Sequence, residues 1–214
     1  MPYSMEFIKP AEIETQSFAI IEAELRRRNV SCPANQMPIL QRVIHTSADF
    51  DYIQNLTFSE NAVEKALDAL RNGADIITDT NMALSGINKK SLHALGGEAH
   101  CFMSDPDVAA EAKRRGITRA MVSMEKAARL SSDNLIFAIG NAPTALIQLE
   151  QLIREHQLAP KLIIGVPVGF VNVVEAKELI LQSGLPCIVA RGNKGGSNIA
   201  AAICNALLYQ LYRA

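Results

Sequence analysis

The C-terminal third of the chain alternates short, uniformly apolar segments with stretches of helical length, and this pattern restricts the fold most. The apolar segments are NLIFAIG from Asn134, KLIIGVPV from Lys161 and PCIVARG from Pro186. They have the length of strands and lack the polar alternation of a half-exposed strand, so we expect parallel strands covered on both faces. Helices are expected between them, at about 142–156 and 173–183.

The rest of the chain continues the alternation. Apolar spacing and capping residues predict further helices at about 17–28, 39–46, 59–73 with Ser59 as its cap, 106–116 after Asp105, 118–130, and from 197 onward. Strands are expected in ADIITD and at about 99–103, with a Ser85-Gly86 turn between them. The 214 residues contain no linker or repeat. We therefore predict an α/β fold in one doubly wound domain, residues 1–214, with a mainly parallel sheet of about five strands flanked by helices.

Three loop-forming segments follow the apolar strands: GNAPTAL from Gly140, GVPVGFV from Gly165 and RGNKGGS from Arg191. In a parallel sheet such loops and the helix N-termini after them gather along one edge, where backbone N–H groups bind anions. The loops match neither GxxxxGK[ST] nor GxGxxG, which gives an ATP or dinucleotide site little support. We expect a large acidic ligand, with Lys194 as one cation. The alternative is that the glycines only permit tight turns.

One histidine has a neighbourhood suited to acid–base chemistry. Arg42, His45 and Asp49 are spaced i, i+3 and i+7, so they share one helix face if the helix continues that far. The guanidinium lowers the proton affinity of the imidazole and the carboxylate raises it, which suits a general acid near neutral pH. The alternative is that His45 is an ordinary surface or core residue.

Two further segments place polar groups at the expected ligand edge. The ADIITD strand ends near Asp79 and Thr80 and is followed by Ser85. These groups either contact a ligand or belong to an ordinary loop in which Asp79 caps the next helix. Arg119 lies in a first helical turn, where its charge opposes the helix dipole, so we expect a ligand carboxylate beside it.

Composition excludes several classes of function. The net charge is −1, with 21 Lys and Arg against 22 Asp and Glu, so no broad positive field attracts nucleic acid or an anionic membrane. The four cysteines form no CxxC pair and no zinc spacing, which favours reduced thiols and predicts no metal site. We see no export signal and no apolar run of about 20 residues, so we expect a cytoplasmic protein without a membrane partner.

Six segments together resemble a known family, the precorrin-8 methylmutases of cobalamin biosynthesis, in the order of the family's motifs. The segments read QRVIHTSADFD, TDTNMALSGINK, GITR, AIGNAPTAL, GVPVGFVNVVEAKE and GNKGGSNIAAAICNALL, and the likeness as a whole covers about residues 17–208. The short TDTNMALSGINK form is more similar to the cobalt-precorrin-8 enzymes, and the alternative is the metal-free precorrin-8X branch. The chain has Asn193 where family members often carry a second basic residue.

The resemblance implies a 1,5-sigmatropic shift of a methyl group from carbon 11 to carbon 12 of a corrinoid ring, giving cobyrinic acid, or hydrogenobyrinic acid in the metal-free branch. It implies no cofactor and a homodimer, with His45 as the catalytic residue that protonates or hydrogen-bonds the ring. Apolar loop residues around Pro143, Pro167 and Phe170 would hold the ring faces. The substrate-binding residues that it implies are Ser17, Arg42, Thr46, Asp79, Thr80, Ser85, Arg119, Asn141, Lys194, Gly195 and Ser197.

Two functions of other classes remain open on the sequence. A corrinoid carrier would use the same site without chemistry, and a nucleotide- or phosphate-dependent α/β enzyme would use the glycine-rich loops differently. Conversion of a bound ring distinguishes the first from an enzyme, and preferential binding of ATP or NAD would favour the second.

Overall fold

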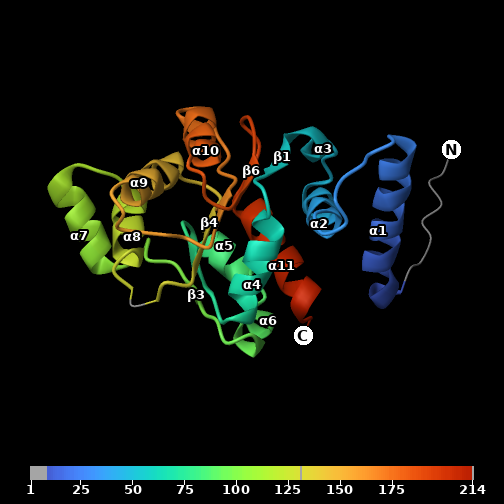
Figure 1. The fold of residues 1–214 in the computed structure, drawn as a ribbon, viewed down its shortest axis with the longest axis horizontal. Helices are drawn as coiled ribbons and strands as arrows, with labels where there is room; N and C mark the ends of the chain where they lie inside the picture. The colour runs from blue at the N-terminus through green and yellow to red at the C-terminus, as the bar shows by residue number, and fades with distance from the viewer. Residues whose placement is uncertain (1–8, 131, 214) are drawn as a thin grey trace.

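A six-stranded, mostly parallel β-sheet forms the centre of the protein (Figure 1). The structure is a computed structural model that describes residues 9–130 and 132–213. The strand order is β1-β6-β5-β4-β2-β3, with β1 antiparallel to β6 and every other pair parallel. The strands are β1 (Leu56–Phe58), β2 (Asp75–Thr78), β3 (Ala99–His100), β4 (Leu135–Ile139), β5 (Leu162–Gly165) and β6 (Cys187–Ala190).

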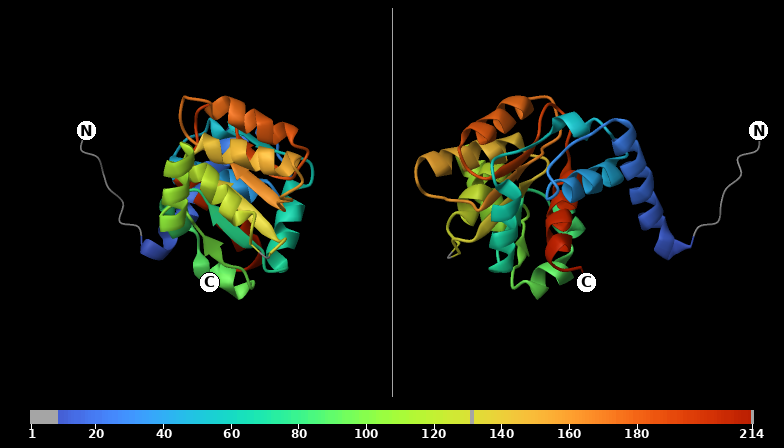
Figure 2. Two further views of the ribbon diagram at one scale, coloured as in Figure 1. Left: turned by 90° about the vertical axis from the view of Figure 1, so that its left-hand side faces the viewer. Right: turned by 45° about the vertical axis from the view of Figure 1, so that its right-hand side comes forward.

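Helices cover both faces of this sheet (Figures 1 and 2). The core on one face contains residues of α2, α4 and α11, and the core on the other contains residues of α8, α9 and α10. The helices are α1 (Pro10–Arg27), α2 (Met37–Ser47), α3 (Tyr52–Asn55), α4 (Ala62–Arg71), α5 (Asn81–Gly86), α6 (Lys89–Ala94), α7 (Pro106–Arg115), α8 (Arg119–Ala127), α9 (Pro143–Arg154), α10 (Val173–Gln182) and α11 (Ser197–Leu211).

The central strands are buried on both sides, as their uniform apolar character predicts. In β4, Ile136 and Ala138 contribute to the core beneath α11, whereas Leu135, Phe137 and Ile139 contribute to the core beneath α9. All five side chains are at most 2% exposed. Since strand side chains alternate between the two faces, a strand between two helical layers needs apolar residues at every position.

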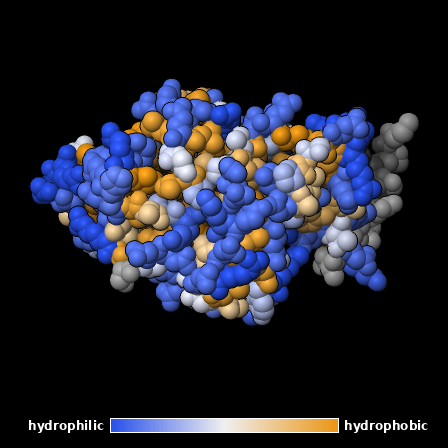
Figure 3. Space-filling model, viewed as in Figure 1, coloured by the Kyte–Doolittle hydropathy of each residue, from blue (hydrophilic) through white to orange (hydrophobic). Residues whose placement is uncertain are grey.

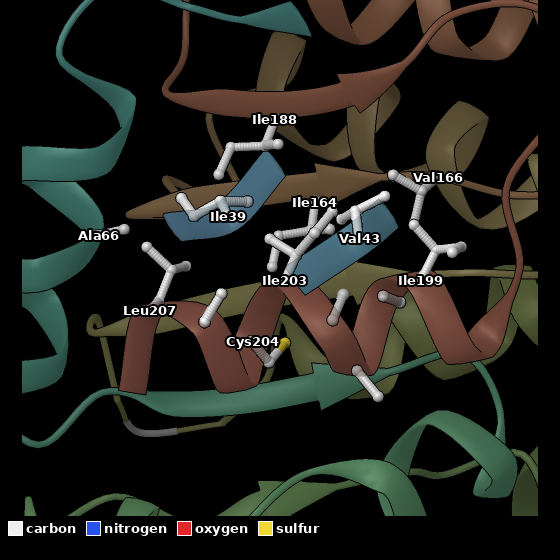
Figure 4. Close-up of a cluster of buried hydrophobic side chains, with 14 of the residues drawn as sticks. Ile39, Val43, Ala66, Ile164, Val166, Ile188, Ile199, Ile203, Cys204 and Leu207 are labelled. Carbon is white, nitrogen blue, oxygen red and sulfur yellow. The ribbon is translucent and has the colours of Figure 1, made fainter. Parts of the chain in front are cut away.

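Helix α11 is apolar on almost all sides because it lies between the sheet, α2 and α5. Figure 4 shows Ile203 of α11 beside Val43 of α2 and Ile164 of β5, and Ile199 of α11 beside Val166. Small residues permit the close approach of α5, since a Cβ at Gly86 would lie 2.8 Å from the Cβ of Ala201. The position of α2 over the sheet is therefore fixed by apolar packing against α11.

Most predicted elements are confirmed, including the mainly parallel sheet and the helices after each C-terminal strand. Helix α7 has Pro106 in its first turn and ends at Gly116 in the left-handed conformation. Helix α1 begins at Pro10 instead of near Ser17. The sequence pattern did not reveal β1, α3 or α6, each of which is too short to establish a period.

Two local predictions are wrong. Ser59 does not cap the following helix, because α4 begins at Ala62 after Asn61, and the Ser59 hydroxyl accepts a hydrogen bond from the Cys187 N–H at 2.8 Å. The Ser85-Gly86 pair does not form a turn after the strand either. It ends α5, whose first turn is capped by the Thr80 hydroxyl through the Ala83 N–H.

Helix α1 lies at the periphery, on the outer side of α2 (Figures 1 and 2). None of the helices in the described part of the chain combines the length and apolarity that a membrane span requires. On the face of the molecule drawn in Figure 3, hydrophobic residues are interrupted by hydrophilic ones.

Replacement of Leu207 by Ala should lower the free energy of unfolding by about 2–5 kcal/mol, because it leaves a cavity between α11 and its neighbours. Leu207 is 1% exposed, whereas Leu179 on α10 is 38% exposed and serves as the matched control. Urea unfolding measures both variants. Equal losses for Leu207→Ala and Leu179→Ala would contradict this assignment of the core.

Candidate active site

The parallel strands β2, β4, β5 and β6 end at one edge of the sheet, and the segments that follow them form the candidate site. The chain leaves β2 through α5 and α6, which pack on the same face of the sheet as α11. It returns from β3 to β4 through α7 and α8, and α8 packs on the opposite face. The edge between β2 and β4 is therefore a topological switch point, where α/β proteins bind ligands.

Asp79 occupies the centre of this switch point. Its side chain is fully buried and accepts hydrogen bonds from the N–H groups of Gly140, Asn141 and Ala142 at 2.9, 2.8 and 2.6 Å. Burial raises the pKa of the Asp79 carboxyl, and the three N–H donors partly oppose that effect. A carboxylate of the chain itself thus fills the anion-binding position at the start of α9. Asp79 holds the β4–α9 loop, instead of presenting its carboxylate to solvent.

Thr80 and Ser197 connect the β2–α5 junction to the first turn of α11. Their hydroxyl oxygens lie 2.8 Å apart, and Ser197 is buried. Ser85 is exposed one turn further along α5. The structure therefore brings Thr80 and Ser197 together as predicted site residues, with Ser85 farther along the same helix.

The 166–172 and 191–196 loops are locked to each other. A Cβ at Gly195 would lie 2.1 Å from the carbonyl oxygen of Val166, so only glycine fits there. The Gly196 N–H donates to the same carbonyl at 2.8 Å. The amide of Asn193 donates to the Gly169 carbonyl at 2.6 Å, and the Gly169 N–H donates back to the Asn193 carbonyl at 3.1 Å.

Lys194 extends this locked pair of loops to the segment after α2. Its ammonium group lies 2.6 Å from a carboxylate oxygen of Asp49 and 2.6 Å from one of Asp51. The bond to Asp49 and Asp51 raises the pKa of Lys194, and the ammonium in turn lowers the pKa of Asp49. Both effects keep Lys194 and Asp49 charged, although their side chains are partly exposed.

The expected Arg42, His45 and Asp49 face does not form. Helix α2 ends at Ser47, and Ala48 has a left-handed backbone with φ of 53°. Asp49 therefore leaves the helix and pairs with Lys194. Asp49 is close to His45 in sequence, but its carboxylate does not lie on the face of α2 that carries His45.

His45 is held by α1 instead. Its ring is half-buried and stacks on Phe18, with centroids 5.1 Å apart and planes inclined by 12°. One turn earlier, the Arg42 guanidinium bonds to Glu14 at 2.5 Å and lies over the rings of Phe18 and Tyr209 at 4.7 and 5.2 Å. Helix α1 thus engages both side chains, a tertiary contact that the spacing within α2 did not reveal.

Ser17 on α1 and Thr46 on α2 are the two other predicted site residues of this region. The Ser17 hydroxyl donates to the Ile13 carbonyl within α1, at 2.9 Å. Thr46 is exposed next to His45.

Arg119 lies beside the β4–α9 loop, on the side away from Asp79. Thr118 caps α8 by accepting the Met121 N–H, and its hydroxyl oxygen lies 2.9 Å from that of Thr144 in the first turn of α9. The Arg119 side chain is exposed and forms no ion pair within the described residues. Asn141 is exposed in the neighbouring loop. Among the predicted cations, Arg119 is thus the one without a carboxylate partner in this part of the chain.

Large apolar side chains are uncovered at the same edge. Phe170 is 90% exposed, Val171 77% and Met82 71%. Of the three residues predicted to hold an apolar ligand face, Phe170 is exposed, Pro143 is half-buried and Pro167 is buried. Exposed apolar groups clustered around a polar edge are typical of a ligand- or protein-binding surface.

The sequence reasoning missed Lys177 of α10. Its side chain is fully buried, and its ammonium donates to the carbonyl oxygens of Gly192 and Lys194 at 2.7 and 2.9 Å. Burial lowers the pKa of Lys177 to about 8. The signal was present in the sequence, because Lys177 stands four residues after Val173 and three before Ile180 on the apolar face of its helix.

No group of three or more His, Cys, Asp or Glu side chains within residues 9–130 and 132–213 is arranged to hold a metal ion. The side chains at this edge provide cations that can bind carboxylates, apolar groups that can contact a ring, and an imidazole able to exchange a proton.

Comparisons with known proteins give a consistent result. A family model described as precorrin-8X methylmutase matches residues 12–210. A cobalt-precorrin-8 methylmutase from Salmonella typhimurium is 46% identical over 215 residues, covering 98% of this chain and all of the relative. A precorrin-8X methylmutase from Pseudomonas aeruginosa is 36% identical, with coverages of 95% and 97%. The crystal structure of precorrin-8x methyl mutase from Thermus thermophilus matches with a TM-score of 0.82 at 35% identity, covering 92% of this chain and 96% of that one.

Replacement of Asp79 by Asn should destabilise the protein by roughly 2–3 kcal/mol, because the amide removes a charged acceptor and turns N–H donors toward the N–H groups of the β4–α9 loop. Asp133→Asn is the control, since Asp133 is exposed. Urea unfolding near neutral pH compares the two variants. The assigned role of Asp79 is contradicted if both variants unfold at the wild-type midpoint.

The contribution of Lys177 to stability should increase with pH. Its folded pKa of about 8 lies below the ordinary value of a lysine, so between these values the unfolded chain binds more protons than the native one. From about pH 7 to about pH 9.5, the difference in unfolding free energy between wild type and Lys177→Met should change by about 2 kcal/mol in favour of wild type. Urea unfolding at both pH values measures it, and a constant difference would disprove the shift.

Proposed function

This chain belongs to the precorrin-8X methylmutase family, and from this premise we propose that it converts cobalt-precorrin-8 to cobyrinic acid by moving a methyl group from carbon 11 to carbon 12 of the ring. The observation that carries the proposal is the position of His45, in the last turn of α2, whose following segment bonds to the β6–α11 loop through Lys194. The end of α2 is thereby tied to loops suited to an acidic, partly apolar ring, which supports a role for the His45 imidazole in the reaction.

The cobalt-containing substrate is favoured over the metal-free one because the Salmonella relative, named for cobalt-precorrin-8, is more similar than the Pseudomonas relative, named for precorrin-8X. The alternative within the family is conversion of precorrin-8X to hydrogenobyrinic acid. Cobalt, where the substrate contains it, would belong to the substrate and not to the protein, and the reaction requires no protein-bound cofactor.

His45 would act as a proton or hydrogen-bond donor to the macrocycle. The migration gains and loses no atoms, so a proton lent to the ring returns to the imidazole after the methyl group has moved. Stacking on Phe18 restricts the orientation of the imidazole, which reduces the reorganisation needed when the ring binds. Asp49 does not hold the imidazole, because its carboxylate is paired with Lys194.

The carboxylates of the substrate rim would bind to cations and to helix N-termini at the same edge. Arg119 is exposed and forms no ion pair within the described residues, so its charge is available to a substrate carboxylate. Lys194 and Arg42 would bind substrate carboxylates while they stay bonded to acids of the chain. These acids are Asp49 and Asp51 for Lys194, and Glu14 for Arg42. Direct contacts are further proposed for Ser17, Thr46, Ser85, Asn141, Gly195 and Ser197, with Thr80 beside Ser197 and Asp79 acting through the β4–α9 loop.

We extend the proposal to the state of the protein in the cell. Residues 1–214 form one methylmutase domain, the protein is a cytoplasmic homodimer, and it acts without nucleic acid or membrane. The exposed side chains of Ile13 and Ile20 on α1 and of Phe170 support a second copy, because each would be covered by an additional apolar surface.

Replacement of His45 by Gln should lower kcat by about 10²–10⁴-fold, as expected for loss of a general acid, while ring binding changes little. Rearrangement extends the conjugation of the ring, so absorption spectra of protein mixed with cobalt-precorrin-8 follow both binding and conversion. His93→Gln is the matched control, because His93 is exposed on α6 away from this edge.

Unchanged turnover of His45→Gln would remove His45 from the mechanism. Wild-type protein that binds the ring without converting it would identify a corrinoid carrier instead of an enzyme. Calorimetric binding of ATP or NAD in preference to a corrinoid would favour a nucleotide-dependent activity.

A further inference from the structure

We propose that Lys177 is a positioning residue for the methyl shift: it fixes the 191–196 loop, and through Lys194 it fixes the segment that follows His45. This inference rests on the proposed function, but the bonds that carry it are properties of the chain itself. Lys177 contacts two backbone carbonyls and no group proposed to react, so it acts through the loop.

The loop is held from two sides. From the inside, Lys177 donates to the carbonyls of Gly192 and Lys194, which flank Asn193. From the outside, the Asn193 amide donates to the Gly169 carbonyl. Three successive residues of the loop therefore have fixed positions, although Asn193 and Lys194 themselves are exposed.

A lysine at this position is costly, which indicates that its two hydrogen bonds matter. Burial is the cause of its lowered pKa, and no carboxylate of the described residues pairs with it. The nearest charged groups of the loop are already paired, Arg191 with Glu178 and Lys194 with the acids after α2. An apolar side chain would fill the same face of α10 without this desolvation penalty.

The same lysine begins a series of contacts that ends at the segment following α2, the helix that carries His45. The backbone of Lys194 accepts from Lys177, and its side chain binds Asp49 and Asp51, just beyond the end of α2. Loss of the Lys177 donors leaves two loop carbonyls unpaired, so the loop backbone shifts toward water and carries Lys194 with it. A displacement of about 1 Å in a positioning group lowers turnover by up to about 100-fold.

The holding function does not require the positive charge. A neutral amine keeps two N–H donors, enough for the carbonyls of Gly192 and Lys194. Glutamine at the same position retains an amide donor on a shorter chain, whereas methionine retains the length and loses the donors. Comparison of Lys177→Gln with Lys177→Met therefore separates the hydrogen bonds from the packing of the side chain.

The test combines hydrogen exchange with kinetics on the full-length chain. In Lys177→Met, amides of the 191–196 loop, including the Gly196 N–H that binds the Val166 carbonyl, should exchange at least about 10-fold faster, while β4 amides remain protected. The value of kcat/KM should fall about 30-fold, with a larger effect on kcat than on KM. Lys177→Gln should recover part of both losses. Lys65→Met, at an exposed position of α4, is the control and should match wild type.

Wild-type exchange in the 191–196 loop of Lys177→Met, or an unchanged kcat/KM with a loosened loop, would overturn the proposal. Losses in Lys177→Met that are equal to or smaller than those in Lys177→Gln would show that the hydrogen-bond donors are not what matters, and would also overturn the proposal. If Lys177→Met does not fold, hydrogen exchange of the loop and kcat/KM are compared between Lys177→Gln and Lys65→Met instead. If wild-type protein fails to convert the ring, the proposed function fails, whereas the exchange result still tests the holding of the loop.

Discussion

The packing of α11 between α2 and the sheet is the constraint on which the candidate site depends. Ile203 of α11 meets Val43 of α2 over the strands, as Figure 4 shows, and Ile199 belongs to the same core. This contact places the last turn of α2, with His45, near the edge where β5 and β6 end. The start of α11 is fixed in turn by Gly195, where no side chain fits, and by the bond between Gly196 and Val166. Apolar packing and one close backbone contact thus set the distance between the imidazole and the loops.

Much of the charge at this edge is neutralised within the chain. Asp79 fills the N–H groups at the start of α9, and Lys194 pairs with Asp49 and Asp51. The glycine-rich loops alone suggested a row of anion sites open to a ligand, but groups of the chain itself already occupy two of these positions. The internal acids hold the loops in place before the ring binds, and preorganisation of this kind lowers the cost of binding. Arg119 is the exposed cation on the far side of the β4–α9 loop.

The sequence was sufficient for the parts of the fold that depend on local pattern. Uniformly apolar strands, Pro106 and Gly116 at the ends of α7, and the start of α8 at Thr118 follow from backbone and burial requirements. Only part of the candidate site could be predicted from the sequence. The end of α2 depends on a left-handed Ala48, which composition does not signal, and the Phe18–His45 stack joins two helices through tertiary packing. Lys177 was missed because a lysine is ordinarily read as a surface residue.

The most direct measurement is a crystal structure of this protein with cobalt-precorrin-8 or its rearranged product bound. We expect the ring at the C-terminal edge of the sheet, with His45 within hydrogen-bond distance of the macrocycle and substrate carboxylates beside Arg119 and Lys194. A ring bound at the opposite edge, for example in the cavity of about 490 Å³ lined by Leu130, His156 and Lys161, would contradict the assignment of the site and of His45.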